Sequence, residues 1–208
     1  MSRLIAFGCS NTYGHGLSDC YIPPVQPGPV ASKTAWPSTL GKLLNVKEVI
    51  NQGNPGASNK LIWKTIVDFN FKQDDLVFIN WSHLNRHCVF GEVYNTYIGP
   101  WVNEKGSKFY YKHLYSELDS KLEFYNRADH AKRYLDSLNI KNFHLLMRRK
   151  IIDNTLLHKP SWFSVDCLTT SLSDLREIHP MALDGRHPGQ LAHNQYANEI
   201  YLEVKEFI

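Results

Sequence analysis

The sequence has few of the features that mark specialised protein classes. Its 208 residues include only 4 cysteines, namely Cys9, Cys20, Cys88 and Cys167. They are too dispersed for a zinc site and too few for a disulfide scaffold, so reduced, partly buried thiols are expected. No apolar run approaches the ~20 residues that cross a bilayer, and no leader-like pattern opens the sequence. We therefore expect no membrane association and, as encoded, a cytoplasmic location.

Excess charge is also small. The chain has 23 Lys and Arg against 20 Asp and Glu, a net charge of +3 with its 10 histidines neutral. This balance gives no reason to expect a nucleic-acid partner. At 43% hydrophobic residues, the chain can bury one substantial core. We predict a single domain over residues 1–208. The composition does not say whether the protein is a monomer or an oligomer.

Apolar periodicity predicts strands that alternate with helices. Short runs typical of buried parallel strands lie at 4–7, 49–50, 76–79 and 143–147. Helical spacing is found at 36–44, at 61–69 after a capping Ser58, over 114–138 as one or two helices, and at 197–208. Residues 18–34 are typical of a loop, and 150–182 show no clear period. Because parallel neighbours need crossovers, we predict a three-layer α/β/α fold, with a flavodoxin-like parallel sheet and helices on both faces.

A serine follows the first predicted strand. The run Leu4 to Phe7 ends at Gly8, which permits a tight exit, and Ser10 comes two residues later. Open parallel sheets bind ligands at the carboxyl ends of their strands. Ser10 is therefore a candidate nucleophile, which needs a neighbouring base to remove its proton.

An aspartate and a histidine far along the chain could supply that base. Asp184 and His187 are three residues apart, so one turn can bring the carboxylate to the imidazole. Pro188 disfavours helical geometry at His187 and can start the next helix. We predict a catalytic triad of Ser10, Asp184 and His187; a helix-capping aspartate beside a surface histidine is the structural alternative.

These two blocks resemble those of the SGNH hydrolases, also called GDSL-type esterases and lipases. The first reads Gly8-Cys9-Ser10-Asn11-Thr12 and the last reads Asp184-Gly185-Arg186-His187. The resemblance implies a serine esterase with the SGNH hydrolase fold and no metal or organic cofactor. Cys9 replaces the usual aspartate, and a small thiol can pack there. Such compact domains occur in bacteria and phages, and a phage origin would imply association with the virion.

The resemblance also implies an oxyanion hole. The backbone N–H groups of Ser10 and Gly56 match two of its donors, although Asn54-Pro55-Gly56 would also make an ordinary turn. The family's third block, Gly-x-Asn-Asp, is missing after the third strand. Candidates for the replaced donor are Asn80, Ser82, His83 and Asn85. The departure predicts weak activity, a narrow substrate range or no activity, because losing one such donor typically costs about 2.7 to 4 kcal/mol.

Aromatic residues are concentrated between Trp81 and Tyr115. We predict an aromatic-rich insertion at about 87–113 that covers the crevice beside Ser10. The predicted substrate contacts are Trp81, Arg86, Tyr94 and Trp101. Sugar rings stack on aromatic side chains, which favours a short acyl ester, most simply acetyl, on a glycan or another small molecule. A β-hairpin or a subunit interface would give the same composition.

Two other functions fit parts of the sequence. A binding or structural protein on a catalytically weak or inactive SGNH scaffold would explain the altered third block. A nucleotide-binding α/β protein is disfavoured, because neither a dinucleotide fingerprint nor a P-loop lysine follows Gly8.

Overall fold

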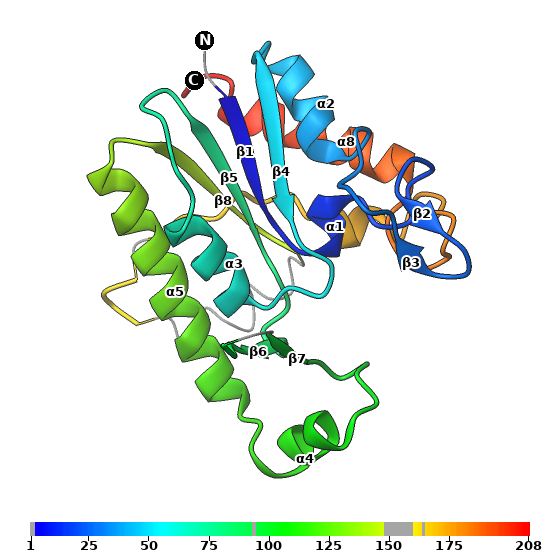
Figure 1. Cartoon of the computed structure of the whole chain (residues 1–208). Coiled ribbons are helices and arrows are strands. Elements are labelled where there is room, and N and C mark those ends of the chain that lie inside the picture. The colour runs from blue at the N-terminus through cyan, green and yellow to red at the C-terminus, as the bar shows by residue number, and fades with distance from the viewer. Residues whose placement is uncertain (1–2, 93–94, 148–159, 164) are drawn as a thin grey trace.

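A parallel sheet forms the centre of the molecule. The computed structural model describes residues 3–92, 95–147, 160–163 and 165–208 (Figure 1). Its sheet has the order β4-β1-β5-β8. The strands are β1 (Arg3–Gly8), β4 (Glu48–Gly53), β5 (Leu76–Trp81) and β8 (Lys141–Leu146). All three pairings are parallel, as predicted, so the strands end at one common edge.

Helices cover both faces of this sheet. They are α2 (Trp36–Leu43), α3 (Asn59–Val67), α5 (Glu117–Ser137) and α8 (Gln190–Val204). Leu4 and Ala6 of β1 pack in a core with α2 and α8, whereas Ile5 and Phe7 pack in a second core with α3 and α5. Successive side chains of a strand point to opposite faces, so one strand contributes to both cores. Figure 1 shows the two helix pairs on opposite sides, which confirms the three layers.

Local capping explains where two of these helices begin. The Oγ of Ser58 accepts the N–H of Leu61 at 3.3 Å, as expected for the cap of α3. The Oγ of Ser116 does the same for Asp119 at 3.2 Å, and the predicted region 114–138 is one helix, α5. Each cap satisfies an N–H that the helix itself leaves without a partner.

The last helix differs from its prediction at both ends. It begins at Gln190 and ends at Val204, and the two hydrophobic residues beyond it, Phe207 and Ile208, are exposed. The apolar stripe therefore stops at Val204, the last buried side chain of the helix. Beyond it the Nζ of Lys141 donates to the carbonyl of Phe207 at 2.9 Å. Among the described residues, no helix is long and apolar enough to cross a bilayer.

Short elements surround the edge where the strands end. Helix α1 (Ser10–Tyr13) follows β1 directly, and α7 (Leu172–Leu175) lies within the stretch for which no period was found. The predicted loop at 18–34 contains a small hairpin, β2 (Tyr21–Ile22) and β3 (Gln26–Pro27). Figure 1 places α1 and this hairpin on the same side of the molecule, beyond the end of β1.

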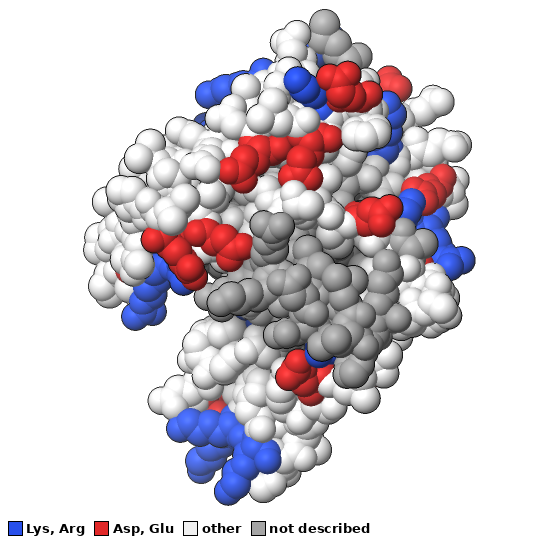
Figure 2. Space-filling model, turned by 180° about the vertical axis from the view of Figure 1, so that it is seen from behind, with Lys and Arg blue, Asp and Glu red and all other residues white. Residues whose placement is uncertain are grey.

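The aromatic stretch extends away from the sheet. It contains an antiparallel hairpin, β6 (His87–Val89) and β7 (Thr96–Ile98), followed by α4 (Lys105–His113). The alternative of a β-hairpin is thus realised in its first part. Figure 1 shows α4 at the tip, away from the layers, and Figure 2 shows Lys and Arg side chains gathered there. The exposed lysines of α4 are Lys105, Lys108 and Lys112.

Candidate active site

Ser10 lies where β1 turns sharply into α1. A side chain at Gly8 would come within 2.1 Å of the Thr12 Oγ1, so only glycine fits this turn. Cys9 is buried, and its Sγ lies 3.3 Å from the Met147 Sδ, as expected for a packed thiol. None of the four cysteines, all of which lie among the described residues, forms a disulfide. Ser10 is 5% exposed and borders a cavity at the carboxyl edge of the sheet.

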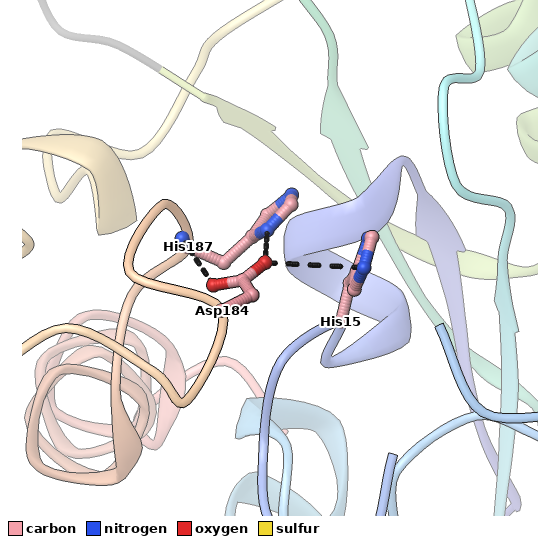
Figure 3. A group of neighbouring side chains, drawn as sticks. All are labelled: His15, Asp184 and His187. Carbon is pink, nitrogen blue, oxygen red and sulfur yellow. Dashed lines mark hydrogen bonds and ion pairs between the residues drawn. The ribbon is translucent and has the colours of Figure 1, made fainter. Parts of the chain in front are cut away.

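The loop before α8 holds Asp184 against His187 (Figure 3). The Asp184 Oδ2 lies 2.5 Å from the His187 Nδ1, and its Oδ1 accepts the backbone N–H groups of Arg186 and His187 at 3.0 Å each. The carboxylate can only accept, so Nδ1 carries the proton and Nε2 has a free lone pair when the ring is neutral. His187 borders the same cavity as Ser10.

The surroundings adjust both protonation states. Burial acts to raise the pKa of Asp184, but hydrogen bonds from the His187 ring and from two backbone N–H groups outweigh it, so the pKa falls below its usual value. Burial is the largest effect on His187 and lowers its pKa; Asp184 opposes this, whereas the charges of His15 and Arg86 add to it. The pair therefore holds a carboxylate and a neutral imidazole at neutral pH.

His15 is a neighbour of this pair that sequence reasoning missed. Its ring stacks on His187 with centroids 4.3 Å apart, and its Nε2 donates to the Val25 carbonyl at 2.9 Å. Gly16 has φ +88°, and a side chain there would come within 2.8 Å of the Asp184 carboxyl carbon. The Gly16 carbonyl also accepts the N–H of Leu183 at 2.9 Å. The His15 loop thus packs directly against the Asp184 loop.

The same three side chains could be considered as metal ligands. One ligand atom each of His15, Asp184 and His187 lies within 4.8 Å of the others. However, the His15 Nε2–H donates a hydrogen bond to the Val25 carbonyl, and the Asp184 Oδ2 accepts one from the His187 Nδ1–H. The His15 Nε2 would have to lose this proton before it could bind a metal. These hydrogen bonds fit a proton relay better than a metal site.

The cavity beside Ser10 has a volume of about 440 Å³. Gly56 lines it with φ +80°, and among the described residues a side chain there would meet only the Tyr97 ring, at 4.0 Å. Within the described residues, the backbone N–H groups of Ser10 and Gly56 have no hydrogen-bond partner. Both residues that are predicted to supply backbone donors line the cavity.

The structure separates the four candidates for the third oxyanion donor. Asn80 and Ser82 are buried at the end of β5, and neither borders the cavities beside Ser10. Asn85 borders neither cavity, and its carbonyl accepts the Tyr111 hydroxyl. His83 does line a second cavity of about 130 Å³, together with Ser10 and His187.

Two of the four predicted substrate contacts line the main cavity. These are Arg86 and Trp101, whose guanidinium carbon and ring centroid are 4.7 Å apart. The prediction for Trp81 is wrong: the side chain is 0% exposed, and its indole N–H donates to the His144 Nδ1 at 2.9 Å. As the last residue of β5 it packs in the core with α5. Tyr94 lies outside the described residues.

Three further residues that line the cavities were not among the predicted site residues. Arg186 lies inside the Asp184 to His187 block and lines both cavities, and Asn11 follows the serine. Position within the blocks could have singled them out. Arg176, which lines the smaller cavity, follows α7 in a stretch without periodicity, so nothing in the sequence connected it with Ser10.

Comparison with known proteins gives matches in structure only. No family model and no curated protein sequence matches the chain. Among solved structures, it is similar to Est24, a carbohydrate acetylesterase from Sinorhizobium meliloti, with 10% identity and a TM-score of 0.59 over 100% of both chains. An aryl esterase from M. smegmatis is 12% identical, with a TM-score of 0.56 over 100% of both chains.

A third similar structure carries the family name. A member of the lipolytic protein G-D-S-L family from Veillonella parvula is 13% identical, with a TM-score of 0.51 over 100% of both chains. At such identities the likeness concerns the arrangement of the backbone. The chain has the SGNH hydrolase fold, as its sequence blocks predicted.

Proposed function

We propose that this SGNH-fold chain is a serine esterase that hydrolyses a carboxylic ester, with Ser10 as nucleophile, His187 as general base and Asp184 as the group that orients the imidazole. The observation that supports this most is the Asp184 Oδ2 to His187 Nδ1 contact of 2.5 Å, on a cavity that Ser10 shares. The contact leaves the other ring nitrogen to receive the serine proton.

In the first half of the reaction, the Ser10 Oγ attacks the ester carbonyl while its proton moves to the His187 Nε2. The resulting oxyanion accepts hydrogen bonds from the backbone N–H groups of Ser10 and Gly56, and we assign the third donor to His83, the one candidate that lines a cavity with Ser10. The carbon–oxygen bond to the alcohol then breaks, and the alcohol takes the proton from Nε2.

In the second half, water attacks the acyl group on Ser10, and its proton moves to the His187 Nε2. The tetrahedral intermediate collapses, the acyl–Oγ bond breaks and Oγ recovers the proton. The products are the free carboxylic acid and the original enzyme. Throughout, Asp184 stays ionised and stabilises the protonated imidazole.

For the substrate we propose a short acyl group, acetyl in the first instance, on a carbohydrate. Trp101 is 54% exposed and lines the cavity, where it offers a surface to the apolar side of a sugar ring. The similarity to a structure described as a carbohydrate acetylesterase supports the same choice. The insertion at 87–113 would then contribute one wall of the substrate site.

A fluorophosphonate probe followed by mass spectrometry tests the reaction. We expect one adduct on Ser10 in the wild type and none in Ser10→Ala. The wild type should also hydrolyse p-nitrophenyl acetate, and Ser10→Ala should not. Ser18→Ala, which changes an exposed serine, is the matched control and should label normally. Absence of both adduct and turnover in the folded wild type would refute the proposal.

A second candidate is a binding protein on an inactive scaffold. It is favoured by the end of β5, where Asn80 and Ser82 are buried and line neither cavity, and by the sequence, which lacks the family's Gly-x-Asn-Asp block after this strand. The labelling experiment separates the two functions, because a binding protein retains the cavity but gives no adduct. Release of acetate from acetylated xylan and other acetylated glycans then tests the substrate class.

A further inference from the structure

Arginine side chains are concentrated around Ser10. Arg86 and Arg186 line both the 440 Å³ cavity and the 130 Å³ cavity, and Arg176 lines the smaller one. They come from three separate segments: the loop after β5, the residue after α7, and the loop that carries His187. The fold therefore brings three positive charges to the two cavities that share the nucleophile.

No described carboxylate neutralises these charges. Within the described ranges, none of the three arginines forms a salt bridge. The carboxylate of Asp184, the closest along the chain to Arg186, already accepts from the His187 ring and from two backbone N–H groups. Like charges that converge without a counter-ion repel one another, so such a cluster is favourable only when an anion joins it.

Some N–H groups of these arginines also lack hydrogen-bond acceptors among the described residues. The Nε and Nη1 of Arg86 are buried and have no partner among the described residues, although the guanidinium lies over the Trp101 ring. Arg176 is held in place, because its Nη1 donates to the Arg186 carbonyl at 2.9 Å. A buried donor without a partner is costly, and more so when it is charged. A guanidinium offers paired N–H groups that match the two oxygens of a carboxylate, sulfate or phosphate.

We propose that Arg86, Arg176 and Arg186 form a subsite for an anionic group of the substrate, so that the ester hydrolysed at Ser10 belongs to an acidic compound. This inference rests on the proposed esterase function and narrows its substrate class: an acylated acidic sugar fits, and a neutral acylated glycan lacks the group that the arginines recognise. The anion and the scissile ester would then occupy the same cavities, because the arginines and Ser10 border them.

A matched pair of esters tests this subsite. The substrates 4-acetoxybenzoate and methyl 4-acetoxybenzoate share the acetyl group and the aromatic ring but differ in charge. We expect the wild type to prefer the anion by about tenfold or more in kcat/KM, with a preference that declines as salt is added. Arg86→Gln and Arg176→Gln should each reduce the ratio, Arg86→Lys should restore part of it, and Arg133→Gln, an exposed arginine on α5, should leave it unchanged.

Failure of the subsite is distinguishable from failure of the esterase function. If the neutral ester is hydrolysed and Ser10 is labelled, but the folded arginine variants keep the wild-type ratio, the subsite is refuted and the esterase stands. If neither ester is turned over, calorimetric titration of the Ser10→Ala protein with 4-acetoxybenzoate decides. Binding that Arg86→Gln weakens supports the subsite, and equal or absent binding of both esters refutes it. Thermal melting of each variant verifies that it is folded.

Discussion

On one side of Ser10, the loop with Asp184 and His187 satisfies the polar atoms that it buries, whereas on the other side the end of β5 does not. Both carboxylate oxygens of Asp184 accept hydrogen bonds. The side-chain amide of Asn80 and the hydroxyl of Ser82 are buried and have no partner among the described residues. Each such group lowers the free energy of unfolding by about 1–3 kcal/mol. The end of β5, here called the oxyanion side, therefore has a cost that the Asp184 and His187 loop, here called the relay side, avoids.

The two sides differ in how far apart their residues lie in the sequence. The relay is a local structure, since Asp184 and His187 are close in sequence and one turn of backbone completes it. The oxyanion side depends on backbone and side chains from the ends of β1, β4 and β5, which only the folded sheet brings together. The relay side is preorganised by short-range bonds, and it is the side on which substitutions should be most damaging.

The largest effect is expected from Asp184→Asn. The amide removes the charge that stabilises the imidazolium and can hold the ring in the wrong tautomer, so kcat/KM should fall by about 10,000-fold. Steady-state hydrolysis of p-nitrophenyl acetate measures it. Asp68→Asn, at an exposed ion pair with Lys64, is the matched control and should retain full activity. A loss below tenfold in Asp184→Asn would remove the relay from the mechanism.

A smaller loss is expected on the oxyanion side. His83→Ala should lower kcat/KM by about 100- to 1,000-fold, because one donor to the developing charge is lost. Asn85→Ala should have little effect, since the contribution of Asn85 to the fold is its backbone carbonyl, which accepts the Tyr111 hydroxyl and remains in the variant. The opposite ranking of the two variants would assign the third donor to Asn85 and overturn our choice of His83.

Packing between the two loops of the relay side can be broken by a single methyl group. Gly16→Ala places a side chain at φ +88° and 2.8 Å from the Asp184 carboxyl carbon, so unfolding free energy should fall by about 1–3 kcal/mol and activity should fall with it. Urea denaturation measures the first effect. Gly106→Ala is the control: it lies in α4, no described atom is within 4 Å of its added carbon, and alanine there should be neutral or stabilising.

The smallest expected effect is a shift in the pH dependence of kcat/KM. His187 must be neutral to accept the serine proton, so kcat/KM should fall as pH drops through its pKa, which burial places below the ordinary value of 6.5. The positive charge of Arg86 also disfavours protonation of His187. Arg86→Gln should therefore raise that pKa and move the acidic limb of the pH profile to higher pH. A limb that moves to lower pH, or does not move, would show that Arg86 does not act on His187.

The frame of the molecule was predictable because it depends on regular patterns. Apolar runs located β1, β4, β5 and β8, and parallel pairing then followed from the helices between them. The spacing of Asp184 and His187 likewise predicted a contact that a single turn can make. In each case the sequence interval determines the geometry, with little help from the rest of the chain.

What could not be predicted depends on which face a residue presents or on distant packing. Trp81 is aromatic and precedes the insertion, but its position as the last residue of a central strand buries it against α5. The stacking of His15 on His187 and the approach of Arg176 to Ser10 join segments from opposite parts of the chain. Composition and periodicity contain no information on such contacts.

The bond between the Gly16 carbonyl and the Leu183 N–H has a consequence for synthesis of the protein. A growing chain releases the segment with Ser10 from the ribosome long before it releases the segment with His187. Under the proposed mechanism, Ser10 has no His187 to accept its proton until the second segment emerges and docks on the first. The proposed reaction at Ser10 can therefore begin only after translation has passed His187.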